Sequence, residues 1–344
     1  MEKLHKCIYC NAVENLTISH IIPDAMTKNN VTYYGVCKTK HNSEFSDKFE
    51  DKIIKEFSYV SNIIGIKTKS NKKPIYPVSL KVCDNMYCKK IASLGDVGNE
   101  SVIRSNDGHQ KFGPIELLEK IPHKGEIIPF EDDEMNISID FDVNLLISME
   151  MGRFIAKISY EWICKKCDIC EKYDFFNDII SYIEEGKGSN RIKIMFEKNL
   201  YEQMQSFSEY GDHCIISFFE EGKVKTIISL FGIAVYYFEF MFPEFEYEKY
   251  MNNIFFINIS TSGTRIERTY SKINLKEEDI NLYLFLNKAR FSIKCFTNKL
   301  DDDLFFVICG NIGKVVDKFD NTPNKSFSVK IEKKTGEGYV SKYL

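Results

Sequence analysis

The sequence predicts an α+β protein in which a small cysteine-containing N-terminal module precedes a larger helical and antiparallel-sheet region. An alternating apolar and polar pattern over residues 16–21 and 31–36 predicts two short strands. An apolar side chain at every fourth position after Asn42 predicts a helix that follows them. Beyond Gly186 the pattern changes to strands separated by tight turns.

The composition is that of an ordinary folded protein. The 344 residues are 44% hydrophobic and 28% charged, which excludes a disordered chain, a collagen-like repeat and a continuous coiled coil. The net charge is −4, so no global basic excess points to nucleic acid, and any such contact must be local. Only residues 61–130 are net positive.

Nothing in the sequence predicts export or membrane insertion. The first residues reach Cys7 without an apolar signal region. The longest apolar run, residues 227–242, is interrupted by Ser229 and Glu239 and is shorter than the ~20 residues that span a bilayer. We therefore expect a cytoplasmic protein, in which the eleven cysteines serve as thiols and metal ligands instead of disulfides.

The pattern divides the chain into three parts. Residues 1–60 contain the two strands, a loop over 23–30 and the helix, whose apolar stripe has a period of four: Phe45, Phe49, Ile53 and Phe57. Residues 61–130 predict a small β-rich region, because short extended stretches are broken by glycine and proline. Residues 131–344 predict a helical and then antiparallel C-terminal domain of unknown role.

The C-terminal domain begins with helical spacing over 145–185, which fits one long helix or two. The clearest later signal is a hairpin formed by residues 214–219 and 227–231 around the turn 220–223. About 150 residues of mostly antiparallel sheet are expected there.

Four residues near the N-terminus have the spacing of a metal site. Cys7 and Cys10 are separated by two residues, and Cys37 and His41 by three, at the predicted start of the helix. A tight turn can direct the first two sulfurs at one point, and side chains four apart share one helix face. Two such pairs supply the four ligands of a closed, structural zinc site.

The same residues frame a histidine, and together they resemble the zinc-bearing ββα-metal members of the HNH endonuclease family. The matching stretches are Cys7–Cys10, Leu16–Pro23 with His20 at the end of the first strand, and Cys37–Asn42. The resemblance covers about the first 60 residues. It implies a ββα-metal nuclease module that binds DNA and hydrolyses phosphodiester bonds.

The resemblance also implies roles for particular residues. His20 would be the general base for the attacking water, and Asn42 would bind a catalytic Mg²⁺ or Mn²⁺. The family usually has a carboxylate before the base, where this chain has Ser19. Either Glu50 or Asp51 supplies the missing carboxylate from the helix, or the cation is held weakly and the substrate phosphate completes its shell.

Two further groups of residues leave the function open. Lys67, Lys69, Lys72 and Lys73 follow the module and are candidates for phosphate contacts, although a solvated loop explains them equally well. Cys164, Cys167 and Cys170 lie in a helical stretch, where buried thiols are a better interpretation than a second zinc site.

The sequence thus supports two hypotheses. The first is a metal-dependent HNH endonuclease, with a defence or restriction role implied by the resemblance and a regulatory partner or sensed ligand for the C-terminal region. The second is a zinc-stabilised module that binds nucleic acid or protein and has lost catalysis at Ser19.

Overall fold

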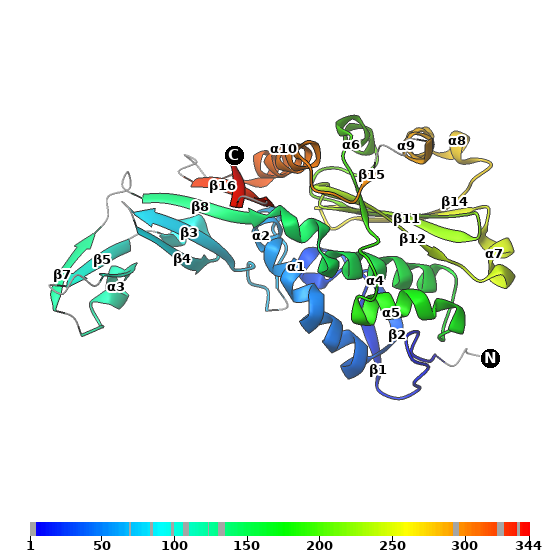
Figure 1. The fold of residues 1–344 in the computed structure, drawn as a ribbon, viewed down its shortest axis with the longest axis horizontal. Coiled ribbons are helices and arrows are strands. Elements are labelled where there is room, and N and C mark those ends of the chain that lie inside the picture. The colour runs from blue at the N-terminus through cyan, green and yellow to red at the C-terminus, as the bar shows by residue number, and fades with distance from the viewer. Residues whose placement is uncertain are drawn as a thin grey trace.

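The protein has a mixed α+β fold, which confirms the predicted class. Its computed structural model describes residues 5–68, 70–82, 85–97, 100–105, 110–122, 124–129, 135–291, 296–321, 327–335 and 338–344. Figure 1 shows an elongated molecule with a lobe of strands at one end and a larger, layered body at the other.

The N-terminal segment folds as two antiparallel strands followed by helix, in the predicted order. Strands β1 (Leu16–His20) and β2 (Thr32–Cys37) pair so that His20 lies opposite Thr32. The helical stretch consists of η2 (Lys38–Ser43) and η3 (Ser46–Glu50), both of the wider π type, then α1 (Asp51–Glu56) and α2 (Ser58–Ile64).

The predicted apolar stripe on this helix is fully buried, at Phe45, Phe49, Ile53 and Phe57. Phe57 packs on Phe141 and Phe231, and Arg153 covers the ring of Phe49. The N-terminal segment therefore shares one continuous hydrophobic core with the rest of the chain.

Helix α4 (Met149–Lys166) lies at the centre of the larger body. In Figure 1, α4 and α5 (Asn177–Glu185) separate strands β1 and β2 from the large sheet. The helical spacing over 145–185 thus corresponds to two helices. They are separated by a turn in which Asp168 has a φ of 54°. Thirteen of the eighteen residues of α4 are buried, because the helix packs against other elements on both sides.

The large sheet has seven strands, in the order β14-β13-β10-β11-β12-β9-β15, and every neighbouring pair is antiparallel. The predicted hairpin is formed by β10 (His213–Glu220) and β11 (Lys223–Leu230). Its two-residue turn has positive φ at Glu221 and Gly222, as tight hairpins require. The other strands are β9 (Lys193–Met195), β12 (Ala234–Met241), β13 (Asn253–Ile259), β14 (Arg265–Ser271) and β15 (Phe296–Thr297).

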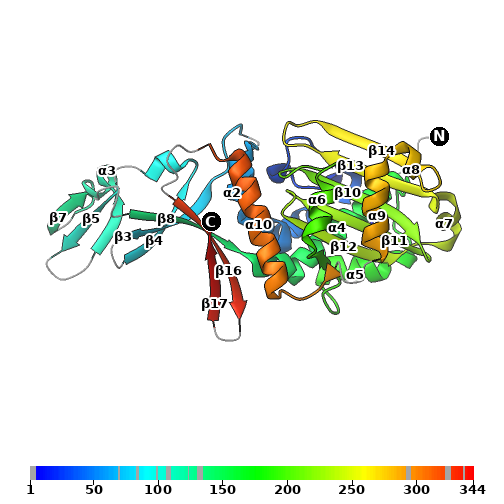
Figure 2. The ribbon, with the colours of Figure 1, turned by 90° about the horizontal axis from the view of Figure 1, so that it is seen from above.

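The C-terminal domain contains more helix than the strand pattern predicted. Helices α6 (Lys198–Met204) and α9 (Ile280–Phe291) lie on the face of the sheet opposite α4, and α10 (Asp302–Phe319) lies between the sheet and the lobe, as Figure 2 shows from above. The expectation of mostly antiparallel sheet was therefore wrong for these segments. In α10 the buried side chains recur at three and four residues, a helical spacing: Leu304, Ile308, Ile312, Val315 and Val316.

The lobe consists of two smaller sheets. A five-stranded sheet has the order β17-β16-β8-β3-β4, and a three-stranded sheet has the order β6-β5-β7. Residues 76–91 therefore pair with 135–142, which pair in turn with 327–335, so this sheet crosses the boundary predicted at residue 130. The strands are β3 (Tyr76–Val82), β4 (Asn85–Ile91), β5 (Glu100–Ser105), β6 (Gln110–Pro114), β7 (Gly125–Pro129), β8 (Met135–Asp142), β16 (Phe327–Thr335) and β17 (Gly338–Tyr343).

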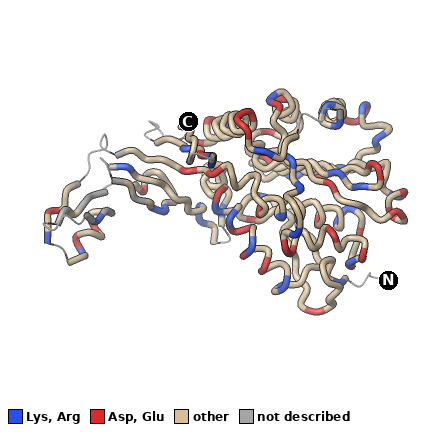
Figure 3. Tube along the Cα trace, in the orientation of Figure 1, with Lys and Arg blue, Asp and Glu red and all other residues tan. Residues whose placement is uncertain are grey.

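Short helices complete the fold: η1 (Asp24–Met26), η4 (Leu94–Val97), α3 (Ile115–Leu118), η6 (Val143–Ile147), η7 (Asp174–Phe176), α7 (Glu244–Tyr250) and α8 (Leu275–Glu278). Among the described residues, no helix is long and apolar enough to cross a membrane. Basic and acidic residues alternate along most of the chain in Figure 3, in keeping with the small net charge.

Candidate metal centre

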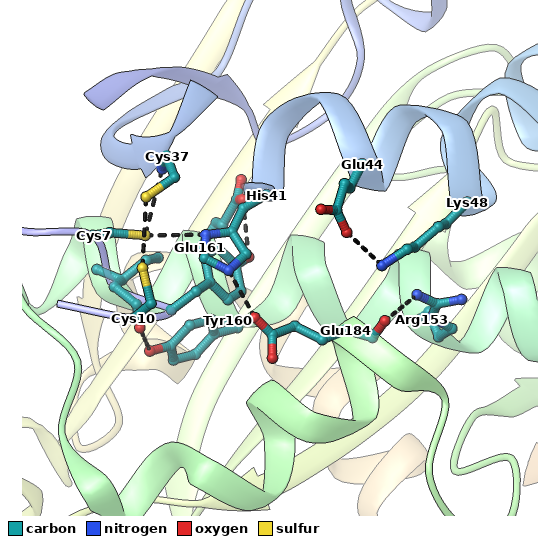
Figure 4. A network of polar contacts seen from close by, with 12 residues as sticks. Cys7, Cys10, Cys37, His41, Glu44, Lys48, Arg153, Tyr160, Glu161 and Glu184 are labelled. Atoms are coloured by element: carbon teal, nitrogen blue, oxygen red, sulfur yellow. Dashed lines mark hydrogen bonds and ion pairs between the residues drawn. The ribbon is translucent and has the colours of Figure 1, made fainter. Parts of the chain in front are cut away.

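The structure brings together the four predicted metal ligands. The Sγ atoms of Cys7, Cys10 and Cys37 and a ring nitrogen of His41 all lie within 4.8 Å of one another. Cys10 is half-buried and the other three are buried. Figure 4 shows the three sulfurs and the imidazole converging from separate segments of the chain.

Local structure explains why these side chains converge. The backbone N–H groups of Cys10 and Asn11 both donate to the carbonyl of Cys7, which closes a tight turn helped by a φ of 62° at Asn11. Cys37 is the last residue of β2, and the helix begins at the next residue. His41 therefore lies in the first helical turn, on the side that faces the cysteines.

The spacing of the ligand atoms suits a tetrahedral ion. Cys10 Sγ lies 3.5 Å from Cys37 Sγ, and Cys7 Sγ lies 3.3 Å from His41 Nδ1. Zinc–sulfur bonds of ~2.3 Å at tetrahedral angles separate two sulfurs by ~3.8 Å, close to these values. Three thiols and one imidazole leave no open position, so the group is a candidate metal-binding site consistent with structural zinc.

A carboxylate outside the N-terminal segment orients the histidine. Glu184 of α5 lies 2.7 Å from His41 Nε2, so the protonated Nε2 donates to this carboxylate and Nδ1 is left to bind metal. Burial acts to raise the pKa of Cys7, but its hydrogen bond with His41 lowers that pKa to about 6. The contact with Glu184 therefore favours the imidazole tautomer that presents Nδ1 to a metal, and the contact with His41 favours the Cys7 thiolate.

Two of the residues predicted to hold a catalytic cation, Ser19 and Glu50, lie in a different, buried network. The Ser19 hydroxyl donates to the Glu161 carboxylate of α4, with oxygen–oxygen distances of 2.9 and 3.0 Å. The ammonium of Lys157, also on α4, lies 2.8 Å from Glu50 Oε1 and 3.4 Å from Glu161 Oε2, and it donates to the backbone carbonyl of His20 at 2.7 Å.

This network is almost completely closed to solvent. Lys157 is 1% exposed and Glu161 is 0% exposed. Tyr9 donates a further hydrogen bond to Glu161 at 3.0 Å. Burial lowers the pKa of a lysine, but the carboxylates of Glu161 and Glu50 outweigh it, so the pKa of Lys157 is raised and its ammonium stays charged.

Of the two predicted catalytic residues, His20 adjoins this network through its backbone carbonyl. His20 is half-buried at the end of β1, and its Nδ1 atom is buried without a hydrogen-bond partner among the described residues. Asn42 follows His41 in η2 and is half-buried. Within the described ranges, the Cys7 group is the one cluster of three or more His, Cys, Asp or Glu side chains able to hold a metal. The catalytic cation therefore remains a prediction.

The predicted phosphate-contacting lysines lie in a surface turn. Lys67, Lys72 and Lys73 are exposed, and Lys69 lies outside the described residues. Thr68 and Lys72 close the turn through backbone and side-chain hydrogen bonds. Lys67 lines an open hollow with Lys28 of the β1–β2 loop. Asp51, the alternative carboxylate, is exposed and accepts a hydrogen bond from Ser46.

Sequence reasoning missed the partners from the C-terminal domain. Lys157 and Glu161 are the two charged residues in the otherwise uncharged stretch 154–164. Their four-residue spacing is the signal from which a buried ion pair could have been predicted. Glu184 had no such signal, because it stands beside the exposed Glu185 at the end of α5, where acidic residues are usually solvated. Cys164 and Cys167 are buried thiols, as expected, whereas Cys170 is half-buried and lies beyond the end of α4.

Comparison with protein-family models finds no matching family, and searches of the curated proteins and of the solved structures find no match either. The function is therefore argued from this geometry.

Proposed function

We propose that this chain is a zinc-stabilised, nuclease-like protein that binds nucleic acid through its N-terminal module and performs no divalent-metal-dependent cleavage. In this proposal one zinc ion is bound by Cys7, Cys10, Cys37 and His41 and fixes the turn, β2 and the helix start relative to one another. This corresponds to the second of the two hypotheses drawn from the sequence.

One observation carries the proposal. The buried ammonium of Lys157 pairs with Glu50 and with Glu161, which accepts from Ser19, so two of the three side chains predicted to bind the cation belong to this network. A divalent ion prefers several oxygen ligands that include charged carboxylates. Here the Glu50 and Glu161 carboxylates already face an internal cation, and placing a second cation beside it would add unfavourable like-charge repulsion.

Cationic side chains around the strand ends support nucleic-acid binding. Lys165 donates to the carbonyl of Thr32, which is paired with His20, and Arg265 reaches the carbonyl of Asn30. Lys28 and Lys67 are exposed, and neither forms an ion pair within the described part of the chain. Arg265 also pairs with Glu267 and Lys165 is half-buried, so Lys28 and Lys67 are the side chains by which this loop would contact phosphates without reading sequence.

The first hypothesis, an HNH endonuclease, is kept as a second candidate because of one observation. The unpartnered Nδ1 of His20 gives this histidine a free acceptor or donor beside the cationic surface, as a general base needs. Under that candidate Asn42 and the substrate phosphate would hold the cation.

Duplex DNA binding by the zinc-loaded protein tests the proposal. We expect fluorescence anisotropy to show binding that weakens as salt rises, because counterions are released from the phosphates. The double variant Lys28→Gln/Lys67→Gln should bind more weakly and lower the slope of log affinity against log salt by about 2.

The matched control is Lys198→Gln/Lys249→Gln, which removes two exposed charges from α6 and α7 and should bind as the wild type does. Absence of wild-type binding at low salt would contradict the proposal. Equal weakening by the two double variants would mean that the contacts lie elsewhere.

A further inference from the structure

A second site lies on the far side of the large sheet, between the sheet and helix α9. It is a small pocket of about 160 Å³ that opens to solvent at its mouth, so a ligand larger than this would extend out of it. Its described lining comes from five strands and one helix: Lys193, Phe218, Glu220, Lys225, Ile227, Tyr237, Ala289, Arg290 and Phe296. The pairing of β10, β11, β12 and β9 sets the floor, because Phe218 lies opposite Lys225 and Tyr237 lies opposite both Ile227 and Lys193.

Arg290 gives this pocket a cation whose hydrogen bonds the protein does not complete. Its guanidinium stacks on Phe218, with Cζ 4.6 Å from the ring centroid. Its Nε and Nη2 atoms are buried and make no hydrogen bond among the described residues, and Nη2 lies 3.6 Å from the Glu220 carboxylate. Buried donors normally form hydrogen bonds. The two N–H groups of Arg290 that lack one are therefore candidates to donate to an oxyanion.

The charges around the pocket have a positive excess. Lys193, Lys225 and Arg290 line the pocket with one acid, Glu220, which lies 2.7 Å from Lys225 and 3.6 Å from Arg290. Lys225 also lies 3.3 Å from Glu221. The nearby Glu239 is paired with Lys223 and accepts from the Tyr237 hydroxyl. Burial and the charge of Arg290 lower the pKa of the neighbouring Lys272 to about 8. An excess of about two positive charges matches a phosphate monoester, which carries ~1.5 to 2 negative charges at neutral pH.

Aromatic side chains form the rest of the wall. The rings of Tyr237 and Phe296 lie 5.2 Å apart, and Lys193 Nζ lies 5.7 Å from the Tyr237 ring centroid. Their planes are tilted by 47°, so each ring separately offers an apolar face against which an aromatic ring can pack. The cationic and aromatic groups are close enough to be reached by one small molecule.

We propose that this pocket binds a nucleoside monophosphate, with the phosphate held by Arg290 and Lys193 and the base packed on Tyr237 and Phe296. The site is separate from the metal centre, because α4 and the sheet lie between them in Figure 1. A small nucleotide bound here would be a ligand for the C-terminal domain that is independent of nucleic-acid binding at the N-terminal module.

Calorimetric titration of the full-length zinc-loaded protein tests this proposal with three probes: adenosine monophosphate, adenosine and inorganic phosphate. We expect saturable binding of the monophosphate and affinities at least about tenfold weaker for the other two, since each fills half of the site. Arg290→Gln should weaken monophosphate binding by about tenfold or more. Lys193→Gln, at an exposed position where folding is not at risk, should weaken it by about threefold or more.

The matched control is Arg268→Gln, which removes an exposed charge from β14 of the same sheet and should leave the affinity unchanged. Absence of monophosphate binding at millimolar concentration would overturn the proposal. Equal binding of inorganic phosphate would overturn the role of the aromatic wall. Equal affinity of wild type and Lys193→Gln, together with a folded Arg290→Gln that still binds, would overturn the assignment of the pocket.

Discussion

Replacing Cys10 by serine should remove the metal ion and unfold the N-terminal segment. Cys10 is the half-buried member of the cluster, so its loss costs little apolar packing and the effect reports on the metal. Structural zinc contributes roughly 10–16 kcal/mol of apparent binding free energy in zinc-finger peptides, more than most domains have in total stability. We expect elemental analysis to give about one zinc per wild-type chain and almost none for Cys10→Ser.

The same variant should melt at a much lower temperature, because the segment shares its core with α4 and the sheet. The control is Cys88→Ser, which changes an exposed cysteine far from the cluster and should retain both zinc and stability. A full complement of zinc in Cys10→Ser would refute the four-ligand assignment. Zinc-free wild-type protein with an unchanged melting curve would refute the structural role.

Replacing Lys157 by methionine should cause the second large effect. The variant has similar volume but leaves the Glu50 and Glu161 carboxylates without their shared cation in a closed interior. Removing one partner of a buried ion pair costs about 3–5 kcal/mol, because the remaining charge is unpaired. We expect a loss of this size in the free energy of unfolding from urea titration.

Two further variants separate this effect from a general loss of packing. Adding Glu161→Gln to Lys157→Met should recover part of the stability, since a neutral amide oxygen can still accept from Ser19 and Tyr9. The control Lys318→Met breaks an exposed pair with Glu209 and should cost at most about 1 kcal/mol. A Lys157→Met variant as stable as this control would show that the network is not an internal ion cluster.

The local elements of the N-terminal segment could be predicted because their signals are local. The period of two around His20, the period of four from Phe45 to Phe57 and the ligand pairs each depend on a few neighbouring residues. The helix start at Lys38 follows the same logic, because His41 can join Cys37 only from the first helical turn. The Glu220–Lys223 turn was predictable for its glycine.

The rest of the site depends on contacts between residues more than a hundred positions apart. Ser19 meets Glu161, and His20 meets Lys157, only because α4 packs across β1 in the folded chain. The pairing of residues 135–142 with 327–335 is likewise set by tertiary structure. Helices α9 and α10 were missed because their apolar residues were interpreted as strand cores, although α10 repeats them at helical spacing.

The most direct test of the central claim, that an internal lysine fills the place predicted for the catalytic cation, is a plasmid-nicking assay. Zinc-loaded full-length protein is incubated with supercoiled DNA and a series of Mg²⁺ or Mn²⁺ concentrations, beside a chelator control and the His20→Ala variant. The account predicts no nicking above the chelator control at any concentration of either ion. Nicking that depends on the divalent ion and disappears in a folded, zinc-containing His20→Ala variant would contradict it and establish the endonuclease instead.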